Sequence, residues 1–156
     1  MIALIRTEFL ENIDEFEVIP YLDDVFVLAC SKNHPLSKNK EVSLKDAAQY
    51  PLSLLSPSSR LYTIVVKAMA NQGLYIKLNC LTTRHKILLE IIQKSDSISI
   101  LPDRLVDTKI FPNIITINLK EDLHSSVAWV RKKEQRVNAI AKEFWNYWKQ
   151  YYNEEA

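Results

Sequence analysis

The sequence predicts an α/β fold built on a parallel β-sheet. Along residues 52–101, short apolar runs typical of strands alternate with segments whose apolar residues recur at helical spacing. The connections between these elements are only a few residues long, which favours right-handed β-α-β units whose strands run in the same direction. With 156 residues, 47% of them hydrophobic, the chain is long enough to bury a core as one domain or as two small lobes.

The first predicted elements are two strands and a long connection. Residues 2–5 form a short β-rich run. A second strand extends over residues 18–29, with an acidic turn predicted inside it at Asp23 and Asp24. Residues 31–40 are polar and contain a proline, so they predict a connection that carries the chain from one lobe to the other.

A short helix and a buried strand follow. Ser43 is the predicted N-cap of the helix, because an acidic residue, Asp46, stands three positions later. The helix must end before Pro51, since proline disfavours helical geometry in the residue that precedes it. Residues 52–55 are uniformly apolar except for one serine, and they form the next predicted strand.

The second half of the chain continues the alternation. A helix with apolar residues over positions 61–69 ends at Gly73, which supplies a C-terminal cap. Residues 75–81 alternate with period two as a strand, and Thr82 and Thr83 cap the helix after it. The remaining predicted elements are a helix with apolar positions Ile87, Leu88, Ile91 and Ile92, a strand at 97–101, a helical turn at 103–108, strands at 114–119 and 127–130, and a C-terminal helix with Val137, Ile140, Ala141, Phe144, Trp148 and Tyr151 on one face.

Composition and charge exclude several classes of function. Gly73 is the only glycine, so the dinucleotide fingerprint, the phosphate loop and the glycine-flanked serine nucleophile cannot be present. A net charge of +1 with both signs interspersed provides no basic face for nucleic acid. The three histidines, His34, His85 and His124, are far apart in sequence and none has metal-ligand spacing with a cysteine. We therefore predict no metal site, no cofactor and no catalytic residues.

The sequence also bears on membranes, location and thiol chemistry. Its longest uncharged apolar run, residues 25–30, is far shorter than the ~20 residues that a membrane helix requires. The first six residues place their charge after a very short apolar stretch, the reverse of a secretory signal, so a cytoplasmic location is expected. Cys30 and Cys80 are accordingly predicted to be free buried thiols.

A candidate anion site lies at the carboxyl ends of the predicted strands. In a parallel sheet these ends meet at one edge, where ligands bind. Hydroxyl groups beside the unpaired N–H groups and positive dipole of a helix start favour a carboxylate, sulfate or phosphate, although the same hydroxyls can simply cap their helices. Arg60 and Arg84 either add charge to this crevice or point to solvent. The predicted lining residues are Ser58, Ser59, Thr82, Thr83 and Pro102.

The aromatic residues of the C-terminal helix allow two interpretations. Their density over residues 144–152 is compatible with base stacking on single-stranded nucleic acid. The near-neutral charge of the chain argues against this interpretation. We expect one face of the helix to pack on the sheet and the other aromatics to meet a partner subunit, because aromatics are enriched in interface cores.

The ordered set of apolar motifs resembles the effector-binding, or substrate-binding, domain of LysR-type transcriptional regulators, a bacterial family with a periplasmic-binding-protein-like fold. The resemblance covers most of the chain. The residues that carry it are Ile2-Ala3-Leu4-Ile5, Val25-Phe26-Val27-Leu28-Ala29 leading into His34-Pro35-Leu36, Val42-Ser43-Leu44-Lys45-Asp46-Ala47, Pro51-Leu52-Ser53-Leu54-Leu55 and Ser97-Ile98-Ser99-Ile100-Leu101-Pro102.

The resemblance implies two lobes that clamp a small effector, often an organic anion, in the cleft between them. By this likeness the second lobe is complete over residues 31–113, and the first lobe is partial, made of residues 1–30 and 114–156. Ser58 and Ser59 match the family's first cleft loop, Thr82 and Thr83 match its polar helix start, and Thr7 faces them from the first lobe. The family's Gly-x-Gly turn is replaced by residues 94–97.

The resemblance also implies the partners. The module is expected to form homo-oligomers and to reach DNA only through a winged helix-turn-helix domain that these 156 residues do not contain. It contacts no membrane and performs no reaction. Two alternatives remain, a free-standing small-molecule binding protein of the same fold and, further from the pattern, an enzyme built on that scaffold.

Overall fold

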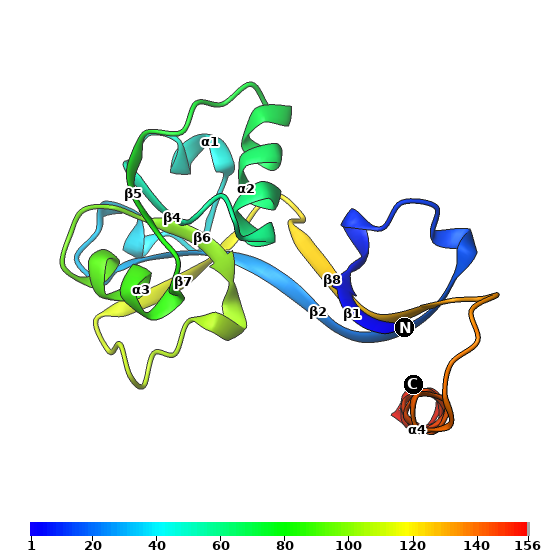
Figure 1. Cartoon of the computed structure of the whole chain (residues 1–156). Helices are drawn as coiled ribbons and strands as arrows, with labels where there is room; N and C mark the ends of the chain where they lie inside the picture. Colours follow the sequence, from blue (N-terminus) through cyan, green and yellow to red (C-terminus); the bar gives the residue numbers. More distant parts are fainter. Residues whose placement is uncertain (156) are drawn as a thin grey trace. The chain divides into compact units, whose positions relative to one another are not determined.

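The computed structural model describes the backbone of residues 1–155 and the side chains of residues 1–154. Helices and strands are interleaved along the chain (Figure 1), which confirms the predicted α/β class. The chain divides into two compact units. Unit 1 consists of Met1–Asp24 and Ser125–Ala156, and unit 2 consists of Val25–His124. The predicted first lobe ends at residue 156, which lies outside the described residues.

Unit 2 contains a mixed sheet around the second half of the longest strand. This strand, β2 (Phe16–Ser31), pairs antiparallel with β6 (Ser99–Pro102) and with β7 (Ile114–Leu119). A two-residue strand, β3 (Glu41–Val42), runs parallel to β7 at the edge. The parallel sheet predicted over residues 52–101 therefore does not extend to β2, whose direction could not be predicted because apolar runs reveal burial but carry no information on strand direction.

The parallel part of unit 2 is the one predicted from the short connections. β4 (Leu52–Leu55) and β5 (Leu78–Thr82) pair in parallel, with Leu55 opposite Thr82. A parallel bridge between Leu52 and Ile98 joins β4 to the segment that leads into β6. The carboxyl ends of these strands therefore lie at one edge. β5 starts three residues later than its apolar pattern predicts.

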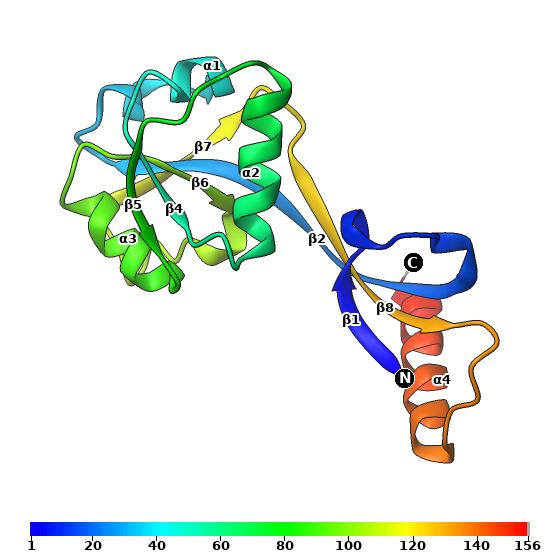
Figure 2. The same cartoon turned by 45° about the horizontal axis from the view of Figure 1, so that its top comes forward.

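Three helices accompany these strands. α1 (Leu44–Ala47) opens with the predicted capping box between Ser43 and Asp46. α2 (Arg60–Asn71) contacts β4 and β6, and α3 (His85–Gln93) contacts β4, β5 and β7 (Figure 2). Gly73 follows α2 with a positive φ of 65°, the left-handed geometry that glycine adopts without a steric cost, which confirms it as the stop signal.

The core of unit 2 lies between these helices and the strands. One cluster is centred on β2, β4 and α2, and a second on α3 and β6. Fully buried side chains of the two clusters include Leu28, Leu52, Leu54, Met69, Leu88, Leu89, Ile92, Ile98 and Leu101.

Unit 1 is built on a three-stranded arrangement in the order β1, β8, β2. β1 (Ile2–Arg6) pairs antiparallel with β8 (His124–Lys132), with Ile2 opposite Arg131. Two 3₁₀ turns, η1 (Thr7–Phe9) and η2 (Ile13–Glu15), connect β1 to β2. The C-terminal helix α4 (Ala139–Glu155) completes the unit.

The predicted acidic turn inside the second strand is wrong. β2 runs without interruption through Asp23 and Asp24. The carboxylate of Asp24 is fully buried, where it accepts a hydrogen bond from Arg6 Nη2 at 2.8 Å. Because the guanidinium compensates the buried charge, the strand continues through two acidic residues that look like a turn in the sequence.

The predicted inner face of α4 also needs correction. Trp145 is the buried aromatic of this helix, 1% exposed, while the predicted core residue Ile140 is 77% exposed. Trp145 Nε1 donates to Glu17 Oε2 at 3.1 Å, and the Arg131 guanidinium lies 4.7 Å from the ring centroid. Arg131 lies in β8 and also pairs with Glu17. The indole with its polar N–H sets the rotation of the helix.

The last predicted turn and strand differ in length from those in the structure. The turn after β6 is the single 3₁₀ turn η4 (Asp103–Leu105), shorter than predicted. β8 is longer than the predicted strand at both ends.

In the described part of the chain, no helix is both long and apolar enough to cross a bilayer.

The two cysteines are expected to differ in reactivity. Both are free, but only Cys30 is buried, and Cys80 is only partly buried, contrary to the prediction for that residue. Burial raises the pKa of the Cys30 thiol to about 11. At pH 8, iodoacetamide should alkylate Cys80 and leave Cys30 intact until the protein unfolds, because the thiolate is the reactive form. Intact-protein mass spectrometry measures this, and rapid double alkylation of the native chain would contradict it.

His34 should make folding stability depend on pH. The ring is buried, Nδ1 accepts from the Leu36 N–H at 3.1 Å, and the ring contacts Tyr50. Burial lowers the pKa of His34 below its ordinary 6.5, against the opposing effect of the Asp96 carbonyl and charge. The unfolded chain therefore binds the proton more readily, so the free energy of unfolding should fall as pH drops below about 6.5.

Urea denaturation at pH 7.5, 6.5 and 5.5 tests this expectation. The matched variant is His34→Gln, which cannot take up the proton. The wild type should lose more stability than the variant between pH 7.5 and pH 5.5. Equal losses would show that His34 does not contribute.

Candidate site at the carboxyl ends of the parallel strands

Two loops that are far apart in sequence meet where β4 and β5 end. The Ser56 N–H donates to the Thr82 carbonyl at 2.8 Å, one position beyond the pairing of Leu55 with Thr82. This bond ties the serine loop, residues 56–59, to the end of β5. Hydroxyl-bearing residues from both segments are thus neighbours within unit 2.

The serine loop is organised by its own hydrogen bonds. The Ser56 and Ser58 hydroxyl oxygens lie 2.6 Å apart, and the Ser59 N–H donates to the Ser56 carbonyl. Ser59 is the N-cap of α2, where its hydroxyl accepts from the Leu61 N–H at 3.2 Å. The cap predicted at Ser59 is therefore confirmed. Ser58 is exposed, so its hydroxyl remains accessible to a ligand.

The threonine segment differs from the expected helix cap. The N-cap of α3 is Arg84, with no side-chain hydrogen bond to the helix, so the predicted cap at Thr82 or Thr83 is wrong. Thr82 instead closes β5, and its Oγ1 accepts from the Arg84 N–H at 3.4 Å in a turn. The start of the helix was predicted one or two residues too early, because threonine favours strand ends and helix caps alike. Thr83 is exposed.

The other predicted site residues of unit 2 occupy different environments. Arg60 is exposed on the first turn of α2, and Arg84 is exposed at the start of α3. Pro102 ends β6, where it is buried and lies opposite Phe26. The two arginines therefore place positive charge at the surface near these helix starts, whereas Pro102 can contribute only shape.

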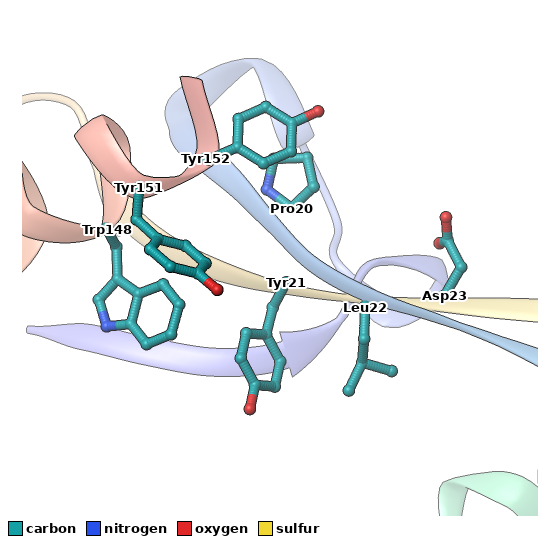
Figure 3. Close-up of a pocket in the computed structure, with 7 residues that line it drawn as sticks. All are labelled: Pro20, Tyr21, Leu22, Asp23, Trp148, Tyr151 and Tyr152. Atoms are coloured by element: carbon teal, nitrogen blue, oxygen red, sulfur yellow. The ribbon is translucent and has the colours of Figure 1, made fainter. Parts of the chain in front are cut away.

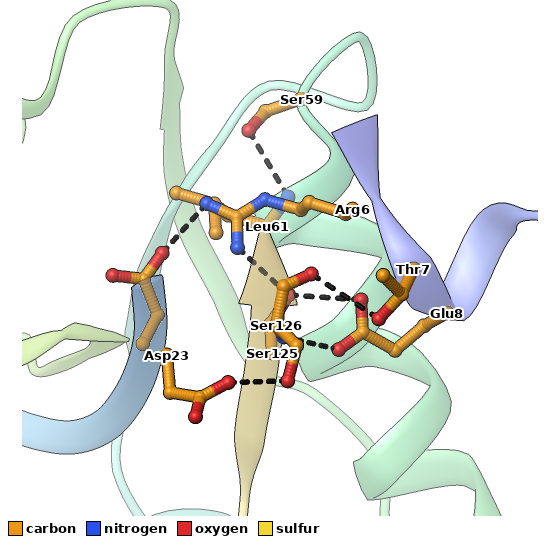
Figure 4. A network of polar contacts seen from close by, with 9 residues as sticks. Arg6, Thr7, Glu8, Asp23, Ser59, Leu61, Ser125 and Ser126 are labelled. Carbon is orange, nitrogen blue, oxygen red and sulfur yellow. Dashed lines mark hydrogen bonds and ion pairs between the residues drawn. The ribbon is translucent and has the colours of Figure 1, made fainter. Parts of the chain in front are cut away.

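Thr7 lies in unit 1, next to a polar network that the sequence did not reveal (Figure 4). Its hydroxyl donates to the Ser126 carbonyl at 3.4 Å. Arg6 Nη1 donates to the Ser125 hydroxyl at 2.7 Å, and Glu8 accepts from both Ser125 and Ser126. The charge of Arg6 is matched by a buried carboxylate, so this guanidinium serves the fold.

A hollow of about 590 Å³ in unit 1 is another concave feature of the structure (Figure 3). We call it the aromatic hollow. None of the seven described residues that line it is cationic, so it is poorly suited to an anion. Its lining residues are Pro20, Tyr21, Leu22, Asp23, Trp148, Tyr151 and Tyr152.

Within the described residues, no group of three or more histidine, cysteine or carboxylate side chains is arranged to hold a metal ion.

The carboxylate of Glu121 is engaged in hydrogen bonds within unit 2. Both of its carboxylate oxygens accept from the Leu44 N–H at the start of α1, at 3.0 and 3.1 Å, and one accepts from Gln72. The Glu121 carboxylate is therefore occupied in capping α1.

Comparison with solved structures gives a consistent fold. The chain is similar to the effector-binding domain of QuiR in complex with shikimate, at 19% identity and a TM-score of 0.81, over 98% of this chain and 72% of that one. It is similar to the regulatory domain of Synechocystis CcmR in complex with 2-PG, at 14% identity and a TM-score of 0.82, over 97% and 73% of the two chains. Full-length CbnR bound to its target DNA matches at 14% identity and a TM-score of 0.73, over 99% of this chain and 52% of that one.

These likenesses define the fold, and the chain spans only about half the length of full-length CbnR. A search of curated proteins gave no match. The protein-family model described as the LysR substrate binding domain matches residues 2–153 of this chain. That match agrees with the resemblance found in the apolar motifs and with the periplasmic-binding-protein-like fold. The chain belongs to the LysR substrate-binding domain family.

Proposed function

We propose that this chain binds a small organic or inorganic anion at the carboxyl edge of β4 and β5, as the effector-binding module of a LysR-type transcriptional regulator. The observation that carries the proposal is the hydrogen bond from the Ser56 N–H to the Thr82 carbonyl, at 2.8 Å. It holds two hydroxyl-bearing segments together beside the starts of α2 and α3. Similar domains bind shikimate and 2-PG, which supports an effector of that size.

The chemistry of the edge favours a negative ligand. The first N–H groups of α2 and α3 have no partner within their helices, and the helix dipoles place partial positive charge there. Arg60 and Arg84 add two exposed cationic side chains next to these helix starts. Ser58, Thr82 and Thr83 add hydroxyl donors. A carboxylate or phosphate would satisfy these groups better than a neutral ligand.

The proposal also includes the lobes, the self-association, the location and the DNA contact that the sequence predicts. The lobes are residues 31–113 and residues 1–30 with 114–156, and Thr7 belongs to the first lobe. The module self-associates, works in the cytoplasm and performs no reaction. DNA is contacted by a separate domain of the regulator, since specific readout needs an element that enters a groove.

Calorimetric titration of the 156-residue chain with shikimate, 2-phosphoglycolate and a neutral polyol tests the site. We expect at least one anion to bind and the polyol not to bind. Thr82→Val and Ser58→Ala should each weaken anion binding by about 1.5–3 kcal/mol, or roughly 10- to 150-fold, because each removes a hydroxyl hydrogen bond to a charged group.

Ser37→Ala is the matched control, because it removes a serine hydroxyl from the 3₁₀ turn η3 (Pro35–Lys38), outside both loops. Its anion affinity should equal that of the wild type. Unchanged affinity in both Thr82→Val and Ser58→Ala would overturn the assignment of the site. Failure of every anion to bind would overturn the proposed function.

A further inference from the structure

The aromatic hollow has the size of a small-ligand site, and the proposed anion site makes no use of it. Its volume of about 590 Å³ lies within the range of small-molecule pockets, about 300–1,000 Å³. Its lining residues come from β2, at positions 20–23, and from α4, at positions 148, 151 and 152. All of them belong to unit 1, so the hollow is a feature of one compact unit (Figure 3).

Three of the rings that line the hollow meet at steep angles. The Tyr21 and Trp148 rings have an interplanar angle of 85°, and the Trp148 and Tyr151 rings have one of 76°, with centroids 5.5 Å apart in each pair. Such a corner presents ring faces in more than one direction. Tyr21, Tyr151 and Tyr152 are each between 41% and 45% exposed, so a ligand in the hollow can reach them.

The charged group at the hollow is the carboxylate of Asp23, which no cation compensates. Asp23 is exposed, and its Oδ1 accepts a hydrogen bond from the Ser126 hydroxyl (Figure 4). Among the described residues it takes part in no ion pair. A second carboxylate, that of Glu8, accepts from the N–H of the same serine and adds negative charge on this side. Lys149 lines a neighbouring groove and not the hollow.

Rings and carboxylate together favour a positively charged organic ligand. The face of an aromatic ring attracts an ammonium group that lies within about 6 Å of its centroid, and a quaternary ammonium also presents methyl groups that pack on the rings. An anion would be repelled by Asp23. A neutral apolar ligand would remove water from the Asp23 carboxylate without compensating its charge.

We propose that the aromatic hollow binds a small organic cation that carries a quaternary or alkylated ammonium group. The positive centre lies beside Asp23, and its methyl groups lie against the rings of Tyr21, Trp148 and Tyr152. The hollow is thus a second ligand site of opposite charge preference. It is independent of the anion site in unit 2.

Titration of the isotope-labelled 156-residue chain with choline, followed by nuclear magnetic resonance, tests the proposal. Choline should cause saturable shifts of the backbone amides of residues 20–23 and 148–152. The matched neutral ligand is 3,3-dimethylbutanol, which has the shape of choline with carbon in place of the charged nitrogen. It should bind at least about fivefold more weakly, because neither the carboxylate nor the ring faces attract it electrostatically.

Two substitutions separate the contribution of the charge from that of a ring. Asp23→Asn keeps the shape of the side chain, and it should weaken choline binding about fivefold at low ionic strength while 3,3-dimethylbutanol is unaffected. Tyr152→Leu keeps an apolar side chain but removes a ring. It should weaken choline binding roughly 2- to 30-fold, the range that corresponds to one cation–π contact.

Asp14→Asn and Tyr75→Leu are the matched controls. Asp14 is an exposed acid of the 3₁₀ turn η2, and Tyr75 is 91% exposed in unit 2, so neither lines the hollow. Both variants should bind choline with the affinity of the wild type. Circular dichroism checks that each variant is folded. The comparison of the two ligands uses the wild type alone, so it stays decisive even if a variant fails to fold.

Three results would overturn the cation site. One is equal affinity of the wild type for choline and 3,3-dimethylbutanol, which would leave only a hollow for apolar groups. The second is the absence of saturable shifts at millimolar choline. The third is a set of shifts confined to residues outside the lining. None of them depends on anion binding at β4 and β5, so the two sites fail or succeed separately.

Discussion

Replacement of Trp145 by alanine is expected to destabilise the fold by about 3–5 kcal/mol, the range for removing a large aromatic side chain from a packed core. Trp145 is the one fully buried aromatic described in α4. The substitution removes the side chain that packs α4 against the strands. It also removes the hydrogen bond to Glu17 and the ring contact with Arg131. The free energy of unfolding from urea denaturation, followed by circular dichroism, measures the effect.

Ile140→Ala is the matched control for this prediction. Ile140 lies on the same helix but is mostly exposed, so its substitution should change the free energy of unfolding by no more than about 0.5 kcal/mol when the chain is dilute. A loss below about 1 kcal/mol for Trp145→Ala would mean that α4 is not packed as the structure describes.

Arg6→Met should cost about 3–5 kcal/mol, because it leaves the carboxylate of Asp24 buried without its partner. The side chain of Asp24 is 0% exposed and that of Arg6 is 14% exposed, with 2.8 Å between Nη2 and Oδ2. The double variant Arg6→Met, Asp24→Leu should recover most of this loss, since it removes both charges. Urea denaturation of the three proteins at pH 7.5 gives the comparison.

An exposed ion pair in the same unit provides the control. Lys132 Nζ lies 3.7 Å from Glu15 Oε2, and both side chains are more than half exposed. Lys132→Met should therefore change stability by about 1 kcal/mol at most. Similar losses for Lys132→Met and Arg6→Met would contradict the assignment of Arg6 and Asp24 as a buried pair.

The elements predicted from apolar periodicity agree best with the structure. The strand expected at residues 114–119 is β7 (Ile114–Leu119), and the cap expected at Ser59 opens α2. In both cases the signal is local, because one strand or one turn contains all the residues that produce it. The stop at Gly73 is equally local.

The features that were missed depend on contacts between distant residues. Asp24 continues a strand only because Arg6, 18 positions earlier, compensates its charge. Trp145 faces inward because Glu17, 128 positions earlier, accepts its N–H. No window of sequence contains either pair, so the pattern alone predicted a turn in one case and the wrong helix face in the other.

Part of the candidate site was predictable, because it follows from the order of strands along the chain. Strand order along the chain predicted that the loops after β4 and β5 lie at one edge. The hydrogen bond from the Ser56 N–H to the Thr82 carbonyl agrees with this prediction. The local role of Thr82 was not predictable, since a threonine between a strand and a helix suits either element. The polar network beside Thr7 requires the pairing of β1 with β8, which the sequence does not show.

The most direct test of the central claim is a nuclear magnetic resonance titration of the isotope-labelled 156-residue chain with shikimate and 2-phosphoglycolate. The claim is that an anion binds at the carboxyl edge of β4 and β5. It predicts saturable shifts of the backbone amides of residues 56–60 and 82–85, with α4 unchanged. Shifts confined to residues that line the aromatic hollow, or no saturable shifts with any anion at millimolar concentration, would contradict it.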